Sequence, residues 1–207
     1  MPVFVFPTSC FPPIAYIHLL LTSKPSIIDL GEHYVKQRYF NRYKLAGPNG
    51  VETLIVPVQN THQKTPVKDI KISYSNNWQK IHLRTIETIY NKSPYYIHYK
   101  DVITKIFHIE HKFLIDLNNY VLDNILKLAN INFNPIFSFQ YIESEDIIDL
   151  RDAFNPKKID ISKTLIFPEY YQVFSYKSGF IPNMSFLDIL LNIGPDVFKY
   201  LMTIKKI

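Results

Sequence analysis

Basic side chains alternate along one stretch of the sequence, between residues 33 and 45. They are Lys36, Arg38, Arg42 and Lys44. The alternation predicts a strand, in which every second side chain lies on one face, about 7 Å from the next. Arginines in such a row can hold a diphosphate or another extended anion through paired hydrogen bonds. The pattern therefore favours an anion site, although a solvated hairpin edge also carries Lys and Arg, which there prevent aggregation.

One histidine, His82, has a position that suits catalysis. Residues 77–91 have the periodicity of an amphipathic helix, and His82 lies on its apolar face, one turn after Trp78. The ordinary pKa of an imidazole suits a general acid or base at neutral pH, so His82 is a candidate catalytic residue. A histidine that simply packs in the core would occupy the same position, and the pattern leaves both roles open.

Carboxylates cluster in residues 142–169, which we expect to form a long surface loop. They are Glu143, Glu145, Asp146, Asp149 and Asp152. Such a cluster could hold Mg²⁺ or supply a catalytic carboxylate pair, and a solvated loop has the same composition. Asp152 is distinguished by its neighbours, because a solvated loop has no need of Leu150 and Arg151. We expect Leu150 to anchor the loop, and Arg151 to point inward toward Asp152 or a ligand, since a buried charge must be paired.

The elements that position these residues are typical of an α/β fold. Apolar runs predict strands at residues 3–6, 26–30, 69–73 and 136–141. Helical patterns predict helices at residues 12–21, 77–91, 95–107, 111–129 and 185–191. A turn at 47–50 joins the strand over 33–45 to one over 52–58. We predict a single α/β domain over residues 1–207, with a small central mixed sheet and a β-hairpin, packed by about five helices. The helix at 185–191 begins with Ser185 and Asp188 at the spacing of a capping box.

Composition excludes several classes of protein. The chain has 207 residues, 47% hydrophobic and 20% charged, which is a normal balance for a globular protein. The net charge of +5 suits an anionic small molecule, and nucleic-acid-binding domains usually concentrate their charge more strongly. Because no glycine-rich nucleotide-binding motif and no metal-ligand spacing occurs, we expect neither a cofactor nor a metal.

The cysteine content and the N-terminus indicate the compartment. Cys10 is the single cysteine, which precludes an internal disulfide and fits a reducing environment. Its apolar neighbours predict a small buried hydrophobic residue rather than a nucleophile. The first 21 residues lack a basic segment and contain four prolines, and no apolar run reaches the ~20 residues that span a bilayer. We expect a cytoplasmic protein without a membrane span.

Several stretches, in order and over nearly the whole chain, resemble the WbqC-like family. They are residues 34–42 with Gly50 and 55–58, 78–82, 90–96, 149–152 with Pro156 and Lys157, 171–174, and 179–190. Four residues of these stretches complete the substrate-binding set that we expect beside Lys36, Arg38, Arg42 and Arg151. They are Gln37, Asn41, Trp78 and Tyr90.

The resemblance implies a role in surface-polysaccharide or modified-sugar synthesis. The broader family opens with a His-Gln-Pro-Asn-Tyr-Leu-Pro stretch, and Phe6 occupies the position of its histidine, which leaves His82 and Asp152 as the expected catalytic residues. We expect a group-transfer enzyme that acts on an anionic activated sugar such as a nucleotide-sugar. The absence of that histidine favours the alternative of a non-catalytic binding or assembly protein in the same pathway. A nucleic-acid binder is the least favoured reading, and the oligomeric state is not predicted.

Overall fold

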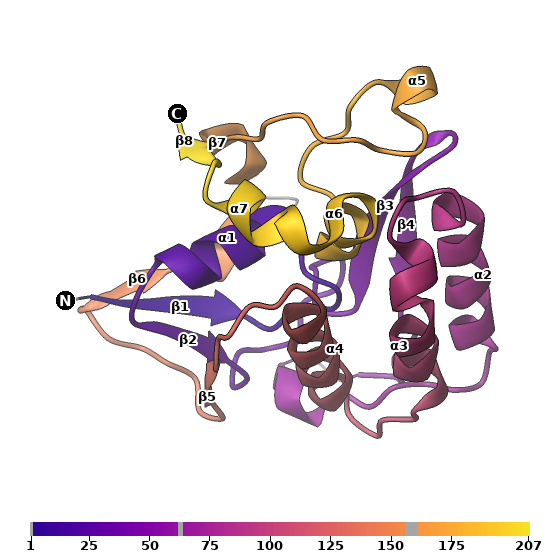
Figure 1. Ribbon diagram of the computed structural model, residues 1–207. Helices are drawn as coiled ribbons and strands as arrows, with labels where there is room; N and C mark the ends of the chain where they lie inside the picture. Colours follow the sequence, from indigo (N-terminus) through magenta and orange to yellow (C-terminus); the bar gives the residue numbers. More distant parts are fainter. Residues whose placement is uncertain (1, 62–63, 156–160) are drawn as a thin grey trace.

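A four-stranded parallel sheet forms one side of the computed structural model, which describes residues 2–61, 64–155 and 161–207 (Figure 1). Its strand order is β5-β2-β1-β6. The strands are β1 (Val3–Pro7), β2 (Ser26–Asp29), β5 (Ile136–Ser138) and β6 (Ile147–Asp149). The central strand β1 is a short run of apolar residues, as is usual for a parallel strand that is covered on both faces.

The register of the sheet places the ends of its strands at one edge. Pro7 at the end of β1 pairs with Asp29 at the end of β2, and Asp29 pairs with Ser138 at the end of β5. On the other side of β1, Val5 pairs with Asp149 at the end of β6. Because all four strands run in the same direction, the loops that follow them emerge from the same edge.

Two antiparallel pairs stand apart from the parallel sheet. The β-hairpin consists of β3 (Arg42–Gly47) and β4 (Gly50–Ile55), joined by a turn in which Gly50 has a φ of 100°. Glycine adopts this left-handed conformation without strain, and a turn that is followed by a residue in this conformation is a common hairpin connection. The second pair is β7 (Leu165–Ile166) with β8 (Lys205–Lys206). The predicted α/β class and hairpin are confirmed, and the parallel and antiparallel pairings occur in separate sheets.

Helices cover the sheet and the hairpin. They are α1 (Ile14–Thr22), α2 (Trp78–Tyr90), α3 (Tyr96–His108), α4 (Leu114–Leu128), α5 (Ser175–Ser178), α6 (Phe186–Ile193) and α7 (Val197–Leu201). Five of these have eight residues or more, close to the predicted number. In the described part of the chain, no helix combines the length and apolarity that crossing a bilayer requires.

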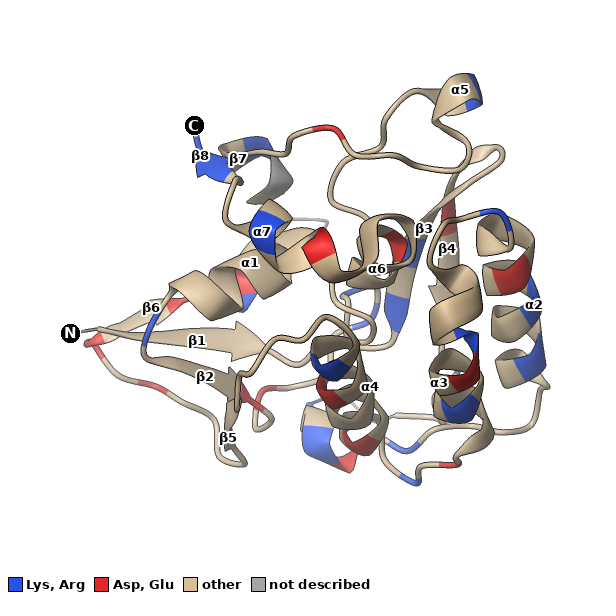
Figure 2. Cartoon of the chain, in the orientation of Figure 1, with Lys and Arg blue, Asp and Glu red and all other residues tan. Residues whose placement is uncertain are grey.

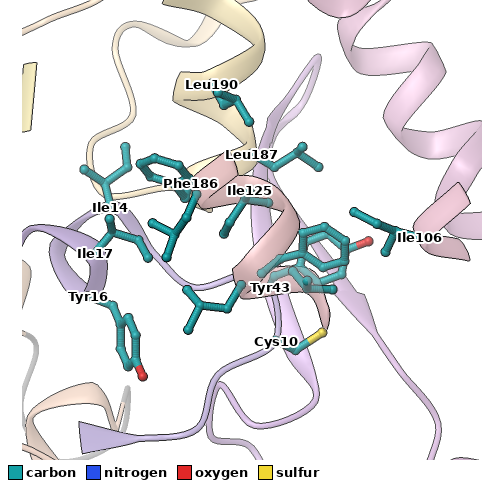
Figure 3. Close-up of a cluster of buried hydrophobic side chains, with 14 of the residues drawn as sticks. Cys10, Ile14, Tyr16, Ile17, Tyr43, Ile106, Ile125, Phe186, Leu187 and Leu190 are labelled. Carbon is teal, nitrogen blue, oxygen red and sulfur yellow. The ribbon is translucent and has the colours of Figure 1, made fainter. Parts of the chain in front are cut away.

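Helix α6 is the centre of the molecule. It contacts α1, α3, α4, α7 and β3, and seven of its eight residues are buried. A helix that is apolar on nearly all sides belongs in a core. Figure 3 shows apolar side chains from five elements meeting there, and it labels Ile14, Ile17, Tyr43, Ile106, Ile125, Phe186, Leu187 and Leu190. Cys10 is fully buried in the same cluster, as predicted, and burial raises the pKa of its thiol.

The strand predicted over 33–45 is wrong for its first part. Residues 36–41 form turns and bends, Gln37 has a φ of 71°, and β3 begins only at Arg42. The alternation there has another origin, because Phe40 is buried while Arg38 is held by ion pairs. Lys36, Arg38 and Arg42 therefore do not share one strand face, and the proposed row of cations is not formed.

The described parts of the segment 142–169 contain more regular structure than a surface loop. It contributes the edge strand β6, which pairs with β1, and short 3-10 helices at Asp152–Phe154 and Ile161–Thr164. A strand of three residues is too short to show periodicity, and it exists because its backbone completes the sheet. The strand predicted at 69–73 is also wrong, since a 3-10 helix at Val67–Asp69 is followed only by isolated bridges. Pro156 and Lys157 lie outside the described residues.

Candidate functional site

A pocket of about 390 Å³ lies at the edge where the parallel strands end. Its lining comes from the loops after β2, β5 and β6, and consists of Glu32, His33, Val35, Arg38, Tyr141, Asp149, Arg151 and Asp152. The chain leaves β1 to form β2 on one side of it and returns to form β6 on the other. Open parallel sheets bind their ligands at the carboxyl ends of the strands, next to such a reversal of strand order.

Arg151 is the most firmly held side chain of this pocket. It is 5% exposed, and its guanidinium donates to Asp29 and, at 2.7 and 2.9 Å, to the two carboxylate oxygens of Asp149. The guanidinium carbon also lies 4.2 Å from the centre of the Tyr141 ring. The prediction that Arg151 is buried and paired is confirmed. Its partners differ from the predicted Asp152, because the side chain turns toward the end of β2.

Asp29 connects two walls of the pocket. Its fully buried carboxylate accepts hydrogen bonds from the backbone N–H groups of Gly31 and Ile142, at 2.7 and 3.2 Å, and from Arg151. These bonds tie the end of β2 to the loop after β5 and to the segment after β6. Burial alone would raise the pKa of the neighbouring Asp149, but its hydrogen bonds with Arg151 outweigh that effect and hold the pKa below its ordinary value.

Arg38 forms a second ion-pair unit. Its two terminal nitrogens donate to Glu32 at 3.0 Å and to Asp152 at 2.6 Å. The Arg38 side chain is 12% exposed, whereas that of Asp152 is 47% exposed. Asp152 is therefore partly open to solvent where it lines the pocket. Arg38 lies directly behind it, so a ligand that enters the pocket can contact Arg38 beside Asp152.

Glu32 is the carboxyl group with the most perturbed environment in the pocket. It is 4% exposed, and its Oε1 is buried without a hydrogen-bond partner, while Oε2 accepts from Arg38. Burial raises the pKa of Glu32 to about 8, against the opposing attraction of Arg38. The sequence predictions missed this residue. Its position directly after a predicted buried strand was the available signal, because ligand-binding loops follow such strands.

Among the described residues, carboxyl groups outnumber guanidinium groups in and directly behind the lining of this pocket. Glu32, Asp149 and Asp152 line it together with Arg38 and Arg151, and the buried Asp29 lies behind the lining, where it pairs with Arg151. Each guanidinium is thus matched by two carboxyl groups. Within residues 2–61, 64–155 and 161–207, no three His, Cys, Asp or Glu side chains converge as ligands for a metal ion.

His82 and Trp78 lie in an aromatic cluster elsewhere. His82 is 2% exposed, and its Nδ1 is 3.0 Å from the hydroxyl of Tyr43. Its ring contacts those of Trp78 and Phe107, with centroids 5.1 and 5.8 Å away. Burial lowers the pKa of His82 to about 4, although a hydrogen bond with the backbone of Ile55 acts in the other direction. Neither residue lines the pocket described here, and the catalytic role of His82 stays a prediction.

Tyr90 belongs to a buried network around Asp188. The Asp188 carboxylate accepts hydrogen bonds from the hydroxyls of Tyr90 and Tyr170 and from the amide of Gln172. The predicted capping box is therefore only half formed: Ser185 caps α6 by accepting from the N–H of Leu187, while Asp188 turns into the core. Burial raises the pKa of Asp188, and the three hydrogen bonds partly offset this.

The remaining predicted binding residues are dispersed. Asn41 is buried and donates to the carbonyl of Val56 at 2.8 Å, which fixes the end of β4. Lys36 and Gln37 are exposed in the turn before β3, and Arg42 is half-buried at its start. Of the ten predicted site residues, the pocket brings together Arg38, Arg151 and Asp152.

The acidic residues between positions 143 and 152 also lie in two different places. Figure 2 shows acidic residues spread along the loop between β5 and β6, where Glu143, Glu145 and Asp146 are exposed. Asp149 and Asp152 lie beyond this loop, in the pocket. The early part of the stretch thus fits the predicted solvated loop, and the later part supplies side chains to the pocket.

Comparisons with known proteins identify the family. The family model described as the WbqC-like protein family matches residues 8–155. A protein of Mycobacterium tuberculosis (strain ATCC 25618 / H37Rv), named "Uncharacterized protein Rv1507c", is 26% identical over 215 residues, which cover 89% of this chain and 92% of the relative. No solved structure matches the chain. The matched range contains β2, the hairpin, the ion pairs of Arg38 and both partners of Arg151, and the chain belongs to the WbqC-like protein family.

Proposed function

We propose that this protein is a cytoplasmic group-transfer enzyme of surface-polysaccharide or modified-sugar synthesis, and that it binds an anionic activated sugar, such as a nucleotide-sugar, in the pocket of Arg38 and Arg151. The observation that carries the proposal is the position of this pocket. It lies where an open parallel sheet reverses its strand order, the usual place for a ligand. Its volume falls within the range of about 300–1,000 Å³ that is common for small-molecule sites.

Arg38 is the residue that would hold the anionic group. Its partner Asp152 is half exposed, so a phosphate can replace this carboxylate on the outer side of the guanidinium. An arginine presents two parallel N–H groups to a phosphate and thereby fixes its orientation. Arg151 is less available, because Asp29 and Asp149 already occupy its donors.

Asp152 would then act on the sugar. Once a phosphate has taken its place on Arg38, the carboxylate is beside the bound substrate and can accept the proton of a sugar nucleophile. A general base needs this proximity, within hydrogen-bond distance of the proton that it removes. The exposed ring of Tyr141 and the side chain of Val35 offer apolar surfaces on the same pocket, against which a sugar ring can pack.

Thermal unfolding with nucleotide-sugars tests the proposal. Uridine diphosphate glucose at 100 times its dissociation constant adds about 2.7 kcal/mol to the free energy of unfolding, which raises the melting temperature measurably. Arg38→Ala should clearly reduce the shift, whereas Arg84→Ala, which removes an exposed cation of α2, should preserve it. Equal shifts in the two variants, or no shift with any nucleotide-sugar in the native protein, would reject the pocket as the binding site.

The alternative is a non-catalytic binding or assembly protein of the same pathway. It is favoured by Phe6, which stands where the broader family has a histidine. Phe6 is fully buried and packs against Tyr16 and Phe154, with ring centroids 5.4 and 6.1 Å away, so it supplies no group for proton transfer. Stabilisation by a nucleotide-sugar without release of nucleotide over time, in the presence of sugar acceptors, would support this alternative.

A further inference from the structure

We infer that the sugar bound in this pocket carries an amine, and that Glu32 is the carboxyl group that receives it. The inference rests on the proposed function and specifies its substrate as an amino sugar. Two features of the pocket carry it: an excess of carboxyl groups over cations, and one buried carboxyl oxygen that has no partner in the protein.

The charge balance favours a cationic group. Four carboxyl groups surround two guanidinium groups, and each guanidinium already contacts two of them. A ligand with negative charge alone would bring a further anion close to the carboxyl group of Glu32, which shares Arg38. An ammonium group on the same ligand offsets this repulsion, because it can contact Glu32 while the phosphate contacts Arg38. The pocket thus fits a ligand that has both charges.

The unpartnered oxygen of Glu32 provides an independent indication. Buried polar atoms in proteins are nearly always hydrogen-bonded, and an exception calls for an explanation. Oε1 of Glu32 is buried without a partner, on a side chain that lines the pocket and whose other oxygen is held by Arg38. When Glu32 is ionised, Oε1 can only accept hydrogen bonds, so the partner that completes this form of the side chain is a donor. The N–H groups of an amine supply that donor together with the charge that the pocket lacks.

Glu32 also links the binding of an amine to a proton. The titratable and charged groups that surround it from the neighbouring elements are Tyr16, Asp29, His33, Arg38, Asp149, Arg151 and Asp152. Burial and this environment raise the pKa of Glu32 to about 8, so its carboxyl group is mainly protonated at pH 7. An ammonium beside it stabilises the carboxylate and lowers that pKa. Binding of an amino sugar should therefore release about one proton at pH 7.

Calorimetric titration with two matched sugars tests the inference. The probes are glucosamine 1-phosphate and glucose 1-phosphate, which share the phosphate and differ in one amine. We expect the amino sugar to bind at least about tenfold more tightly, since a charge-assisted hydrogen bond has an effect of this order. Titrations in two buffers of different ionisation enthalpy should show release of about one proton for glucosamine 1-phosphate and none for glucose 1-phosphate.

A variant and its control assign the effect to Glu32. Glu32→Gln, with its fold checked by circular dichroism, should lose both the preference for the amine and the proton release. Glu52→Gln removes an exposed carboxylate of β4 and should keep both. If Glu32→Gln fails to fold, the difference in affinity and proton release between the two sugars, measured with the native protein, still tests the inference.

The outcomes separate this inference from the proposed function. Equal affinity for the two sugars, tighter binding of glucose 1-phosphate, or amine binding without proton release would overturn the inference. If uridine diphosphate glucose still stabilises the native protein in such a case, the proposed function stands. If no nucleotide-sugar and neither sugar phosphate binds, both are rejected.

Discussion

Replacing Glu32 by glutamine should change how the stability of the protein depends on pH. The glutamine side chain has the size of the glutamate side chain and resembles its protonated form, but it does not titrate. In the folded protein the pKa of Glu32 is raised to about 8 by burial, whereas in the unfolded chain it returns to about 4.5. Between these two values the folded protein holds a proton that the unfolded chain has released.

The sign and size of the effect follow from this difference. Because the folded state binds more protons, the free energy of unfolding falls as the pH rises from about 5 to 8, by up to about 1.4 kcal/mol per pH unit. Over three units the native protein should lose up to about 4 kcal/mol relative to Glu32→Gln. The two proteins should be similarly stable at pH 5, and the variant should be the more stable at pH 8.

Urea unfolding at several pH values from 5 to 9 measures the difference directly. Other groups with raised or lowered pKa values, such as Asp188 and His82, are present in both proteins and cancel in the comparison. Glu52→Gln, which replaces an exposed carboxylate of β4, serves as the matched control. A constant difference between Glu32→Gln and the native protein, or one that grows toward low pH, would refute the assignment of a raised pKa to Glu32.

Three further predictions concern arginine and histidine side chains. Arg151→Met should reduce the free energy of unfolding in urea by roughly 3–5 kcal/mol, because it leaves the carboxylate of Asp29 buried without its cation, and adding Asp29→Asn should restore part of the loss. His82→Gln should cost roughly 1–3 kcal/mol while nucleotide-sugar affinity stays unchanged; unchanged stability with lost turnover would instead support the predicted catalytic role. Arg38→Ala should weaken nucleotide-sugar binding by about 1.5–3 kcal/mol in calorimetric titration, and Arg42→Ala should not. Equal losses of binding in Arg38→Ala and Arg42→Ala would instead indicate an anion site that includes the basic residues before and within β3.

Local patterns predicted the elements that are long or that have a strong turn signal. The apolar stripe of residues 77–91 corresponds to α2 and that of 111–129 to α4, each within a few residues. The turn residues at 47–50 located the hairpin, since a positive φ at Gly50 is a local requirement. Such features depend on residues that are close in sequence, so the sequence alone displays them.

Elements that depend on distant partners were not predictable in this way. Strand β6 has three residues and forms only because β1, more than 140 residues earlier, offers its edge. Conversely, residues 34–41 alternate like a strand, but Arg38 is drawn out of that pattern by Glu32 and by Asp152, which is 114 positions away. Periodicity cannot distinguish an alternation that arises from pairing in a sheet from one that arises from ion pairs across a loop.

The candidate site shows the same division. The burial of Arg151 was predictable, because an arginine between a leucine and an aspartate in an acidic stretch needs a reason to be there. Its main partner was not, since Asp29 lies 122 positions earlier and approaches only when β2 and β6 are placed on either side of β1. Trp78 and Tyr90, which were assigned to the site because they lie in stretches that resemble the family, instead form parts of the core.

The two ion-pair units have a cost that bears on function. Arg38 and Arg151 each join the end of β2 or the segment after it to the end of β6 or the segment after it. Each guanidinium pairs with one carboxyl group that is buried, Glu32 or Asp29, and with one that is partly exposed. Well-packed apolar residues at such positions often make a protein as stable or more stable, because charged groups lose hydration when they are buried. An arrangement of this kind, at the edge of the sheet where ligands bind, is therefore poorly explained by stability alone. Sites that depart from the most stable solution are commonly those that a protein uses, and here the departure coincides with a pocket.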